Sequence, residues 1–317
     1  MSNKYILVTG AAGFIGSKVT QELLDLGRNV IAVDCFLPNL YSAESKRRRW
    51  ESLKTHSSEI QLIKLEFDLR VDNFSRLSKF DIDSVINEAA MPGLSSDWSN
   101  FATYYECNLN ALNRLLEFSK TKQLRSFIQA STSSVYGQSA VGDESQNLHP
   151  TSPYGISKLA AEKLLFAYAE WFSIPVKILR YFSVYGPHQR PDMAYAMLIE
   201  AINTNKPFTV FGNGEQKRSN TYIDDIVSAT ILAEENSMNN YVMNVCGDET
   251  VSLNEVIEIL QEISGKKLIL VGGANRTGDQ KVTSGLNTKI KQTLGWESKT
   301  SIREGLLAQY EASLRTI

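Results

Sequence analysis

Short apolar runs alternate with longer amphipathic segments through roughly the first 180 residues of the chain. The apolar runs are typical of strands buried on both faces of a parallel sheet, and they lie at 4–9, 29–34, 60–67, 84–88, 126–130 and 176–180. The amphipathic segments predict helices directly after the first strand and at about 43–54, 102–121 and 153–172. This alternation predicts an α/β fold of the Rossmann type, with a doubly wound parallel sheet.

The composition of the chain changes after residue 182, where prolines and glycines become frequent and the predicted elements become shorter. We therefore predict a first domain over 1–182 and a smaller C-terminal α/β domain, which binds the substrate, over 183–317. A helix that opens with the acidic pair at 224–225, in a segment around 218–238, is expected to rejoin the first domain. Ligands of an open parallel sheet bind at the carboxyl ends of its strands. The residues expected at this edge are Gly10, Asp34, Asp68, Ala89, Thr132 and Phe182.

The formal net charge of the 317-residue chain is -2, and 21% of its residues are charged. Because there is no basic surplus, we expect neither nucleic acid nor an anionic membrane as a partner. No apolar run approaches the roughly 18 residues that cross a bilayer, and the N-terminus enters the first strand directly, so we expect no membrane span and no signal peptide. The widely spaced Cys35, Cys107 and Cys246 fit a reducing cytoplasm, and the scattered histidines predict no metal site.

Three glycines, Gly10, Gly13 and Gly16, lie between the first strand and the helix that follows it. Gly10 permits a tight turn, Gly13 lets a pyrophosphate approach the helix N-terminus, and Gly16 lets the helix pack closely on the strand. Asp34 ends the second strand about 20 residues on, where a carboxylate binds the adenosine ribose hydroxyls. This pattern predicts a dinucleotide site, and Asp34 favours NAD because it would repel the 2′-phosphate of NADP. The alternative interpretation of the three glycines is a phosphate-binding loop for another ligand. The basic cluster at 47–49 is interpreted as a solvated helix face.

Tyr154 and Lys158 are four residues apart and therefore share one face of a predicted helix. An ammonium group held close to a phenol lowers its pKa from about 10, so that the phenol can exchange a proton with a sugar or alcohol hydroxyl near neutral pH. The hydroxyl-rich loop at 130–137 follows the fifth strand and would bring Thr132 to the same edge of the sheet. Considered singly, the pair is also compatible with a solvated lysine, and the loop with an ordinary Ser/Thr-rich turn.

Together, the glycine motif, the hydroxyl-rich loop and the Tyr-x-x-x-Lys pair resemble the extended short-chain dehydrogenase/reductase family, and more narrowly its NAD-dependent epimerase/dehydratase group, which acts on nucleotide sugars. The resemblance runs nearly end to end and includes the segments 180–187 and 210–214. It implies an enzyme with NAD as cofactor, a UDP-sugar substrate, a homodimeric assembly, and Thr132, Tyr154 and Lys158 as the catalytic residues. The residues that it places around NAD are Gly10, Gly13, Phe14, Ile15, Gly16, Asp34, Asp68, Leu69, Ala89, Ala90, Asn108, Tyr154, Lys158, Tyr181 and Phe182.

The same resemblance implies that Arg218 and Arg276 bind the diphosphate and that Phe211 borders the base. Guanidinium groups suit a diphosphate because each presents planar, paired donors. In the implied reaction, Tyr154 removes the proton of the sugar 4-hydroxyl while NAD takes the hydride from C4. Related 4,6-dehydratases have an acid and a base directly after the threonine, whereas this chain has two serines at 133–134, and the glutamate of related decarboxylases is also absent. We therefore expect 4-epimerisation.

The segment 189–194, Gln-Arg-Pro-Asp-Met-Ala, resembles the matching segment of UDP-glucuronate 4-epimerases. A uronate carboxylate needs donors, and Arg190, Ser133 and Ser183 are expected to supply them, which would also suppress loss of carbon dioxide from the 4-keto intermediate. The expected reaction is therefore the interconversion of UDP-glucuronate and UDP-galacturonate. The alternatives are a 4-epimerase of UDP-glucose or UDP-N-acetylglucosamine, a UDP-glucuronate decarboxylase, and a non-catalytic NAD-binding protein, with Arg190 as a structural loop residue.

The chain departs from the family pattern at three places, one of which is Ser219 in place of the usual aspartate after Arg218. The His-Leu-Ala-Ala that is common after the fourth strand is Asn-Glu-Ala-Ala at 87–90, so Glu88 is expected in or against the sheet, where it would need a partner. The arginine that related uronate epimerases have near Ser95 is absent, which moves the task of binding a carboxylate to Arg190.

Overall fold

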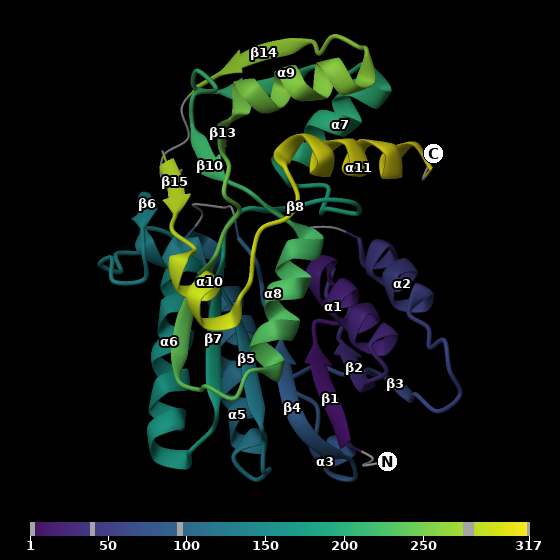
Figure 1. Ribbon diagram of the computed structural model, residues 1–317, viewed down its shortest axis with the longest axis vertical. Coiled ribbons are helices and arrows are strands. Elements are labelled where there is room, and N and C mark those ends of the chain that lie inside the picture. Colours follow the sequence, from purple (N-terminus) through teal and green to yellow (C-terminus); the bar gives the residue numbers. More distant parts are fainter. Residues whose placement is uncertain (1–3, 39–41, 94–97, 275–281, 316–317) are drawn as a thin grey trace.

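The computed structural model describes residues 4–38, 42–93, 98–274 and 282–315. At its centre is a sheet of seven parallel strands in the order β12-β7-β5-β4-β1-β2-β3 (Figure 1). The bounds of these strands are Lys4–Thr9 for β1, Asn29–Asp34 for β2, Leu62–Glu66 for β3, Asp81–Asn87 for β4, Ser126–Thr132 for β5, Val176–Tyr181 for β7 and Tyr241–Val245 for β12. The winding direction reverses between β1 and β4, and the predicted Rossmann-type doubly wound sheet is confirmed.

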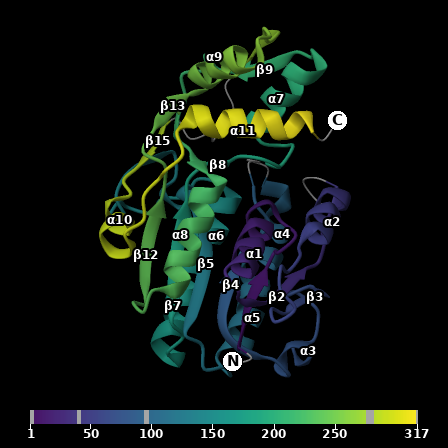
Figure 2. The same cartoon turned by 45° about the vertical axis from the view of Figure 1, so that its right-hand side comes forward.

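Helices cover both faces of this sheet, which is why its strands read as nearly continuous apolar runs. On one face α1 (Phe14–Asp25) and α8 (Ile223–Glu235) lie side by side (Figures 1 and 2), and their apolar residues share one buried cluster with β1. On the other face α5 (Ala111–Ser119) and α6 (Pro153–Phe172) share a second cluster with β1. The helix α2 (Ala43–Ser52) and the short α3 (Ser75–Ser78) also belong to this part.

The helix predicted over 102–121 is not one regular helix. The segment consists of the single turn η1 (Trp98–Asn100), α4 (Phe101–Tyr104), the π-helical turn η2 (Tyr105–Asn110) and α5. Asn108 lies in the π-helical turn, where its side chain accepts from the Met91 N–H at 2.7 Å and donates to the Ser157 hydroxyl of α6 at 2.9 Å. The predicted helix is therefore present up to Ser119, but the π-helical turn within it was not predicted, because an apolar period does not report a single widened turn.

The second region lies across the carboxyl edge of the large sheet (Figure 2). Its helices are α7 (Ala194–Thr204), α9 (Leu253–Ser264) and α11 (Ile302–Leu314). Two parallel strand pairs belong to it, which are β9 (Phe208–Phe211) with β14 (Leu270–Gly273) and β8 (Val184–Tyr185) with β11 (Thr221–Tyr222). The chain returns to the large sheet through α8 and β12, and α10 (Thr288–Leu294) contacts both. In the described part of the chain, no helix has the length and apolar character to cross a bilayer.

A four-stranded sheet ties the second region to the loop that follows β5. Its strands are, in order, β13 (Thr250–Ser252), β10 (Lys217–Ser219), β15 (Val282–Gly285) and β6 (Ser139–Gly142). β6 comes shortly after the turn η3 (Ser133–Tyr136), and it pairs along its whole length with β15. Backbone hydrogen bonds therefore connect the hydroxyl-rich loop to the strand next to β10.

Candidate active site

The loop between β1 and α1 is shaped for close approach of a ligand. Gly10 has a φ of +64°, which favours glycine, and a Cβ there would lie 2.8 Å from the Ala89 backbone nitrogen. A Cβ on Gly16 would lie 2.2 Å from the Gly10 carbonyl oxygen, so α1 can pack this closely on the loop only with glycine. Gly13 is the N-cap of α1, and the first helical residue, Phe14, lines a cavity. The N–H groups of this first turn are therefore available to an anion such as a pyrophosphate.

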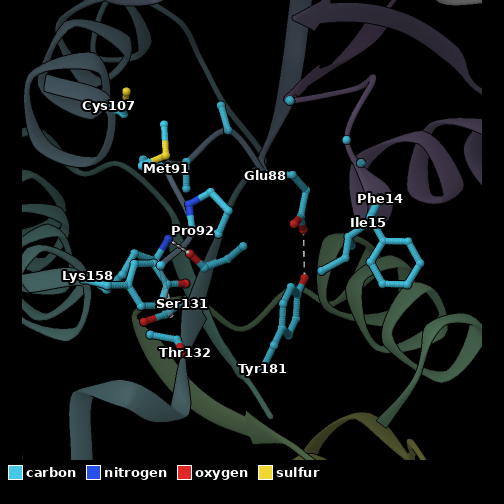
Figure 3. Close-up of a pocket in the computed structure, with 18 of the residues that line it drawn as sticks. Phe14, Ile15, Glu88, Met91, Pro92, Cys107, Ser131, Thr132, Lys158 and Tyr181 are labelled. Atoms are coloured by element: carbon cyan, nitrogen blue, oxygen red, sulfur yellow. Dashed lines mark hydrogen bonds between the residues drawn. The ribbon is translucent and has the colours of Figure 1, made fainter. Parts of the chain in front are cut away.

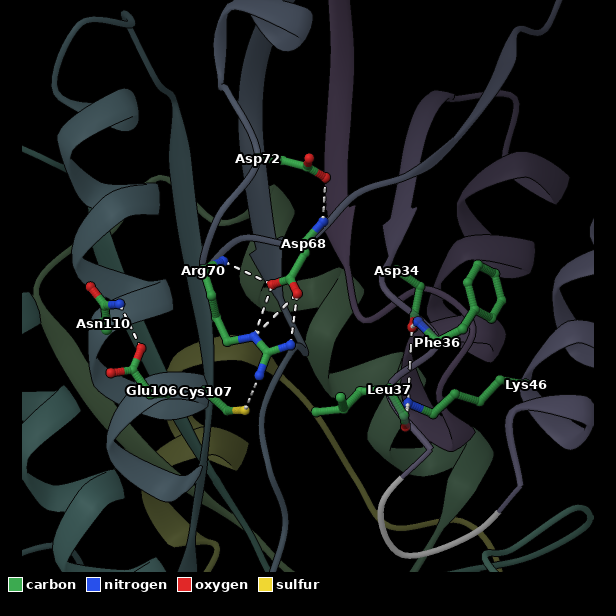
Figure 4. Close-up of polar contacts among 10 residues, drawn as sticks. All are labelled: Asp34, Phe36, Leu37, Lys46, Asp68, Arg70, Asp72, Glu106, Cys107 and Asn110. Carbon is green, nitrogen blue, oxygen red and sulfur yellow. Dashed lines mark hydrogen bonds and ion pairs between the residues drawn. The ribbon is translucent and has the colours of Figure 1, made fainter. Parts of the chain in front are cut away.

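Asp34 ends β2 and is held at the same cavity by backbone donors (Figure 4). Its Oδ2 accepts from the Ala12 N–H at 3.0 Å, and its Oδ1 accepts from the Phe36 N–H at 2.8 Å. These two bonds fix the carboxylate at the sheet edge, where the sequence predicts that it meets ribose hydroxyls.

Lys46 of α2 was missed by sequence reasoning. Its ammonium nitrogen lies 3.9 Å from Asp34 Oδ1, and the residue lines the cavity. A lysine that precedes three arginines on one helix is typical of a solvated face, so its role was not visible in the pattern. Of those arginines, Arg47 and Arg48 form surface ion pairs, whereas Arg49 donates to the Ala12 carbonyl oxygen at 3.1 Å.

Asp68 follows β3 and forms a paired contact with Arg70 (Figure 4). The Arg70 Nε lies 3.0 Å from Oδ1, and its Nη2 lies 2.7 Å from Oδ2. These hydrogen bonds lower the pKa of the Asp68 carboxyl, which stays ionised. Asp68, Leu69 and Arg70 all line the cavity, together with Cys107 of η2.

The cavity has a volume of about 430 Å³ and joins the two ends of the predicted site. The predicted residues that line it are Gly10, Gly13, Phe14, Ile15, Gly16, Asp34, Asp68, Leu69, Ala89, Ala90, Thr132, Ser133, Tyr154, Lys158, Tyr181, Ser183, Arg190 and Arg218. They come from the carboxyl ends of β1, β2, β4, β5 and β7 and from the second region, so the topology brings together residues that are far apart in the chain.

Three predicted site residues that the structure describes do not line this cavity. Asn108 is buried behind the cavity wall, where it holds the backbone of Met91. Phe182 is fully buried in an apolar cluster, because successive residues of an extended chain point to opposite sides and the preceding residue faces the cavity. Phe211 lines an adjoining cavity of about 1590 Å³, which it shares with Arg218. Arg276 lies outside the described residues, as does the position near Ser95.

The three predicted catalytic residues line the same cavity. Figure 3 shows Thr132 and Lys158 at its wall. Thr132 is the last residue of β5, and Tyr154 and Lys158 lie in the first two turns of α6. The Ser152 hydroxyl caps this helix by accepting from the Gly155 N–H at 3.1 Å, which fixes where α6 begins. Thr132 forms a side-chain hydrogen bond with the Tyr154 phenol.

Burial raises the pKa of the Tyr154 phenol to about 12, although the hydrogen bond with Thr132 and the charge of Arg190 lower it. Burial also lowers the pKa of the Lys158 ammonium group to about 8. In the protein without a bound cofactor, Lys158 therefore does not lower the pKa of Tyr154 as expected. The Lys158 side chain points to β5 and not to the phenol, and it donates to the Ala130 carbonyl oxygen (Figure 3).

Arg190 lies in the loop between β8 and α7 and forms a paired contact with Asp192. Its Nε lies 2.9 Å from Oδ1, and its Nη2 lies 2.7 Å from Oδ2. The guanidinium group lines the cavity close enough to Tyr154 to affect its pKa, and Ser133 and Ser183 line the same cavity. Asp192 was missed in the sequence, although an aspartate two residues after an arginine is a signal for such a pair.

Glu88 lies directly after β4 and has a partner, as expected, but the sequence did not identify that partner. It lines the cavity, and its Oε1 lies 2.9 Å from the Tyr181 hydroxyl (Figure 3). The partner comes from β7, and no spacing rule connects residues so far apart in the chain.

A family model described as the NAD dependent epimerase/dehydratase family matches residues 6–246. The chain is 40% identical over 307 residues to the uncharacterized UDP-glucose epimerase YtcB of Bacillus subtilis, and the match covers 95% of each chain. It is 37% identical over 309 residues to a UDP-glucuronate 4-epimerase of Thermodesulfobacterium geofontis, covering 95% of this chain and 94% of that one. The solved UDP-glucuronic acid 4-epimerase of Bacillus cereus, in complex with UDP-glucuronic acid and NAD, matches with a TM-score of 0.93 and 39% identity, covering 99% of this chain and 100% of the other.

Proposed function

This chain belongs to the NAD-dependent epimerase/dehydratase family, and from that membership we propose that it is an isomerase, a UDP-sugar 4-epimerase that interconverts UDP-glucuronate and UDP-galacturonate. The observation that carries the sugar assignment is that Arg190, Ser133 and Ser183 line the same cavity as Tyr154. A guanidinium group and two hydroxyls in this place offer charge-assisted donors to a uronate carboxylate.

NAD is the cofactor, and the described residues fit it. The Gly10 loop with the N-terminus of α1 suits the pyrophosphate, and the fixed carboxylate of Asp34 suits the adenosine ribose. Lys46 is a further donor beside that carboxylate. When bound, NAD supplies a hydride acceptor for the sugar C4 and is regenerated in each cycle.

The side chains of the protein handle the proton and the position of the sugar. Tyr154 takes the proton of the 4-hydroxyl, and Thr132 holds the phenol through its hydrogen bond. Lys158 is anchored on β5 by its hydrogen bond to the Ala130 carbonyl oxygen, and the positive charge that oxidised NAD would bring to the cavity would favour the ionised form of the Tyr154 phenol. The small side chains of Ser133 and Ser134 leave room for the 4-keto sugar to turn and accept the hydride on its other face.

The same two serines limit what can follow the first oxidation. Dehydration of the 4-keto sugar needs an acid and a base beside the sugar, and serine hydroxyls, which stay neutral near pH 7, supply neither. Return of the hydride is then the remaining route, which gives 4-epimerisation.

The carboxylate of the uronate needs restraint, because a 4-keto-glucuronate is a β-keto acid and loses carbon dioxide readily. Asp192 fixes the orientation of the Arg190 guanidinium group with two hydrogen bonds. We propose that Arg190, with Ser133 and Ser183, holds the carboxylate near the ring plane, where its C–C bond is poorly aligned with the π system of the ketone.

A UDP-glucose 4-epimerase is the second candidate, because Asp192 offsets part of the charge of Arg190. A neutral sugar would not need that charge, and the B. subtilis relative carries the name of a UDP-glucose epimerase. The ratio of turnover of UDP-glucuronate to turnover of UDP-glucose distinguishes the two candidate functions.

We also propose a cytoplasmic homodimer that contributes to polysaccharide biosynthesis. Large aromatic groups are exposed on the helices that follow β4 and on α6, and they include Trp98, Phe101, Tyr105 and Trp171. Such groups on neighbouring helices are typical of a subunit interface. The three cysteines are free, which fits a reducing compartment.

Incubation of the purified protein with UDP-glucuronate, without added NAD, tests the proposed function. We expect proton NMR to show the anomeric signal of UDP-galacturonate, which would establish the uronate substrate and retained NAD together. A UDP-pentose with release of carbon dioxide would instead identify a decarboxylase. No reaction with the uronate, together with turnover of UDP-glucose, would establish the second candidate.

Replacing Arg190 with alanine is expected to lower turnover of UDP-glucuronate about tenfold or more and to release a UDP-pentose as a by-product, because the carboxylate loses its charged donor. Turnover of any neutral UDP-sugar should change less than about twofold. The matched control is Arg303→Ala, which removes a surface arginine that pairs with Glu262 at 2.7 Å. Unchanged uronate turnover without a pentose product would contradict the assigned role of Arg190.

A further inference from the structure

Glu88 is the first member of a chain of oxygen atoms at the cavity wall. Its Oε1 is 2.9 Å from the Tyr181 hydroxyl oxygen, which is 2.8 Å from the Thr230 hydroxyl oxygen of α8. The Thr230 oxygen is in turn 2.8 Å from the Ile226 carbonyl oxygen. The chain therefore contains three contacts of hydrogen-bond length in series.

The number of hydrogens in this chain determines the protonation state of Glu88. Each contact needs one hydrogen, and the Ile226 carbonyl has none to give, whereas the Tyr181 and Thr230 hydroxyls have one each. The third hydrogen must come from the Glu88 carboxyl. All three contacts are satisfied only when Glu88 is a neutral acid that donates to Tyr181. The direction of its pKa agrees, because burial raises it to about 7.

Ionisation of Glu88 leaves this chain one hydrogen short. Tyr181 must then donate to the carboxylate, and the Thr230 hydroxyl can serve either Tyr181 or Ile226 but not both. Losing a hydrogen bond is unfavourable, and burial of the Glu88 carboxyl also disfavours its ionised form. An ionised Glu88 therefore needs a cation in the cavity to compensate.

The charged and titratable groups that face Glu88 come from two elements. On β7 the Tyr181 hydroxyl contacts it, and on α6 the Lys158 ammonium group lowers its pKa, while Glu88 in turn raises the pKa of Tyr154. Ile15 of α1 lies beside it and carries no charge (Figure 3), and the uncharged Thr230 of α8 contacts the Tyr181 hydroxyl. Lys158 offers limited compensation, because burial lowers its own pKa to about 8.

The nicotinamide ring is the group whose charge changes during the reaction, because the oxidised ring is cationic and the reduced ring is neutral. We propose that Glu88 sets how readily bound NAD is reduced: it is ionised opposite the oxidised ring and takes up a proton when the ring becomes neutral. This inference rests on NAD binding and is independent of which sugar the enzyme uses. It gives Glu88 a role in the hydride step in addition to the roles of Thr132, Tyr154 and Lys158.

The proposed step balances in atoms and charge. The C4–H bond of the sugar breaks, and its hydrogen leaves with both electrons for the ring, while the proton of the 4-hydroxyl goes to Tyr154. One further proton, from solvent, goes to Glu88. When the hydride returns to the sugar, Glu88 releases that proton.

A sugar-free assay tests the proposal. Holoenzyme saturated with UDP is treated with cyanoborohydride, a small hydride donor, and formation of reduced nicotinamide is followed by its absorbance. The rate is measured from about pH 5 to about pH 9 for the unmodified protein and for Glu88→Gln, whose amide imitates the neutral acid. We expect the ratio of the Glu88→Gln rate to the unmodified rate to rise from near one at low pH to about tenfold at high pH, because only the unmodified protein gains a carboxylate that favours the cationic ring.

One further variant isolates the effect. Glu66→Gln also removes one negative charge at the end of a strand, but Glu66 is 63% exposed and pairs with Arg47 on the surface, so its rates should follow those of the unmodified protein. Each variant is compared at equal NAD content and with an unchanged circular dichroism spectrum.

A ratio that stays constant over the whole pH range would overturn the proposal, and so would an equal change in Glu66→Gln. If Glu88→Gln does not fold, Glu88→Leu, which restores the residue common in the family, replaces it with the same expectation. Absence of reduced nicotinamide in every protein, including the unmodified one, would contradict NAD binding itself. Failure with UDP-glucuronate but a pH-dependent ratio would overturn only the assigned sugar.

Discussion

Replacing Tyr154 with phenylalanine is expected to lower the turnover number of the epimerase by about 10³-fold, while KM for the sugar nucleotide changes by no more than about threefold. The substitution removes one hydroxyl and keeps the ring, so the shape of the cavity wall is retained. What is lost is the group that hydrogen-bonds Thr132 and takes the proton of the sugar hydroxyl. Steady-state kinetics with UDP-glucuronate, at equal NAD content, measure the effect.

Tyr168→Phe is the matched control for this prediction. Tyr168 lies on the same helix, and its hydroxyl donates to Glu117 at 2.6 Å, away from the cavity. We expect it to keep nearly full turnover. A Tyr154→Phe variant that keeps more than about a tenth of the activity would show that another group removes the proton.

Gly16→Ala is expected to cause the largest loss of stability and cofactor together. The added Cβ would lie 2.2 Å from the Gly10 carbonyl oxygen and 2.9 Å from its carbon, both of which are backbone atoms that cannot move aside alone. α1 must therefore shift away from the loop, which we expect to lower the free energy of unfolding by about 3 kcal/mol and the melting temperature by roughly 5–10 °C. The same shift carries the helix N-terminus away from the pyrophosphate, so the purified variant should contain little NAD.

Gly272→Ala serves as the control for the added methyl group. Gly272 lies in β14, and a Cβ there meets no atom within 4 Å. Its melting temperature and NAD content should match those of the unmodified protein. Equal stability of the Gly16 and Gly272 variants would show that α1 tolerates a wider separation from the loop than the structure indicates.

The parts of the site that the sequence predicts are those where one residue type satisfies a local demand. Gly10 and Gly16 are examples, because the backbone atoms around each leave no room for a side chain, so that glycine alone fits at that position. The strands are predictable for a related reason, since burial on both faces demands apolar residues throughout. The position of Thr132 at a strand end follows from the same pattern.

The parts that could not be predicted depend on where a side chain ends, or on contacts between distant segments. The spacing of Tyr154 and Lys158 places both on one helix face, but it does not show that Lys158 reaches β5 instead of the phenol. The chain from Glu88 to Thr230 joins β4, β7 and α8, and no local period encodes it. The π-helical turn that carries Asn108 has the same apolar pattern as the α-helix that was expected.

The pairing of β6 with β15 determines how the molecule can open. β6 follows the hydroxyl-rich loop and pairs with β15, and β15 pairs with β10, the strand that contains Arg218. Backbone hydrogen bonds therefore connect the two regions at one margin of the site. We expect any separation of the two regions to pivot on this paired edge and to widen the opposite margin, between α2 and α7, where the larger cavity lies. A sugar nucleotide is then expected to enter and leave at that margin.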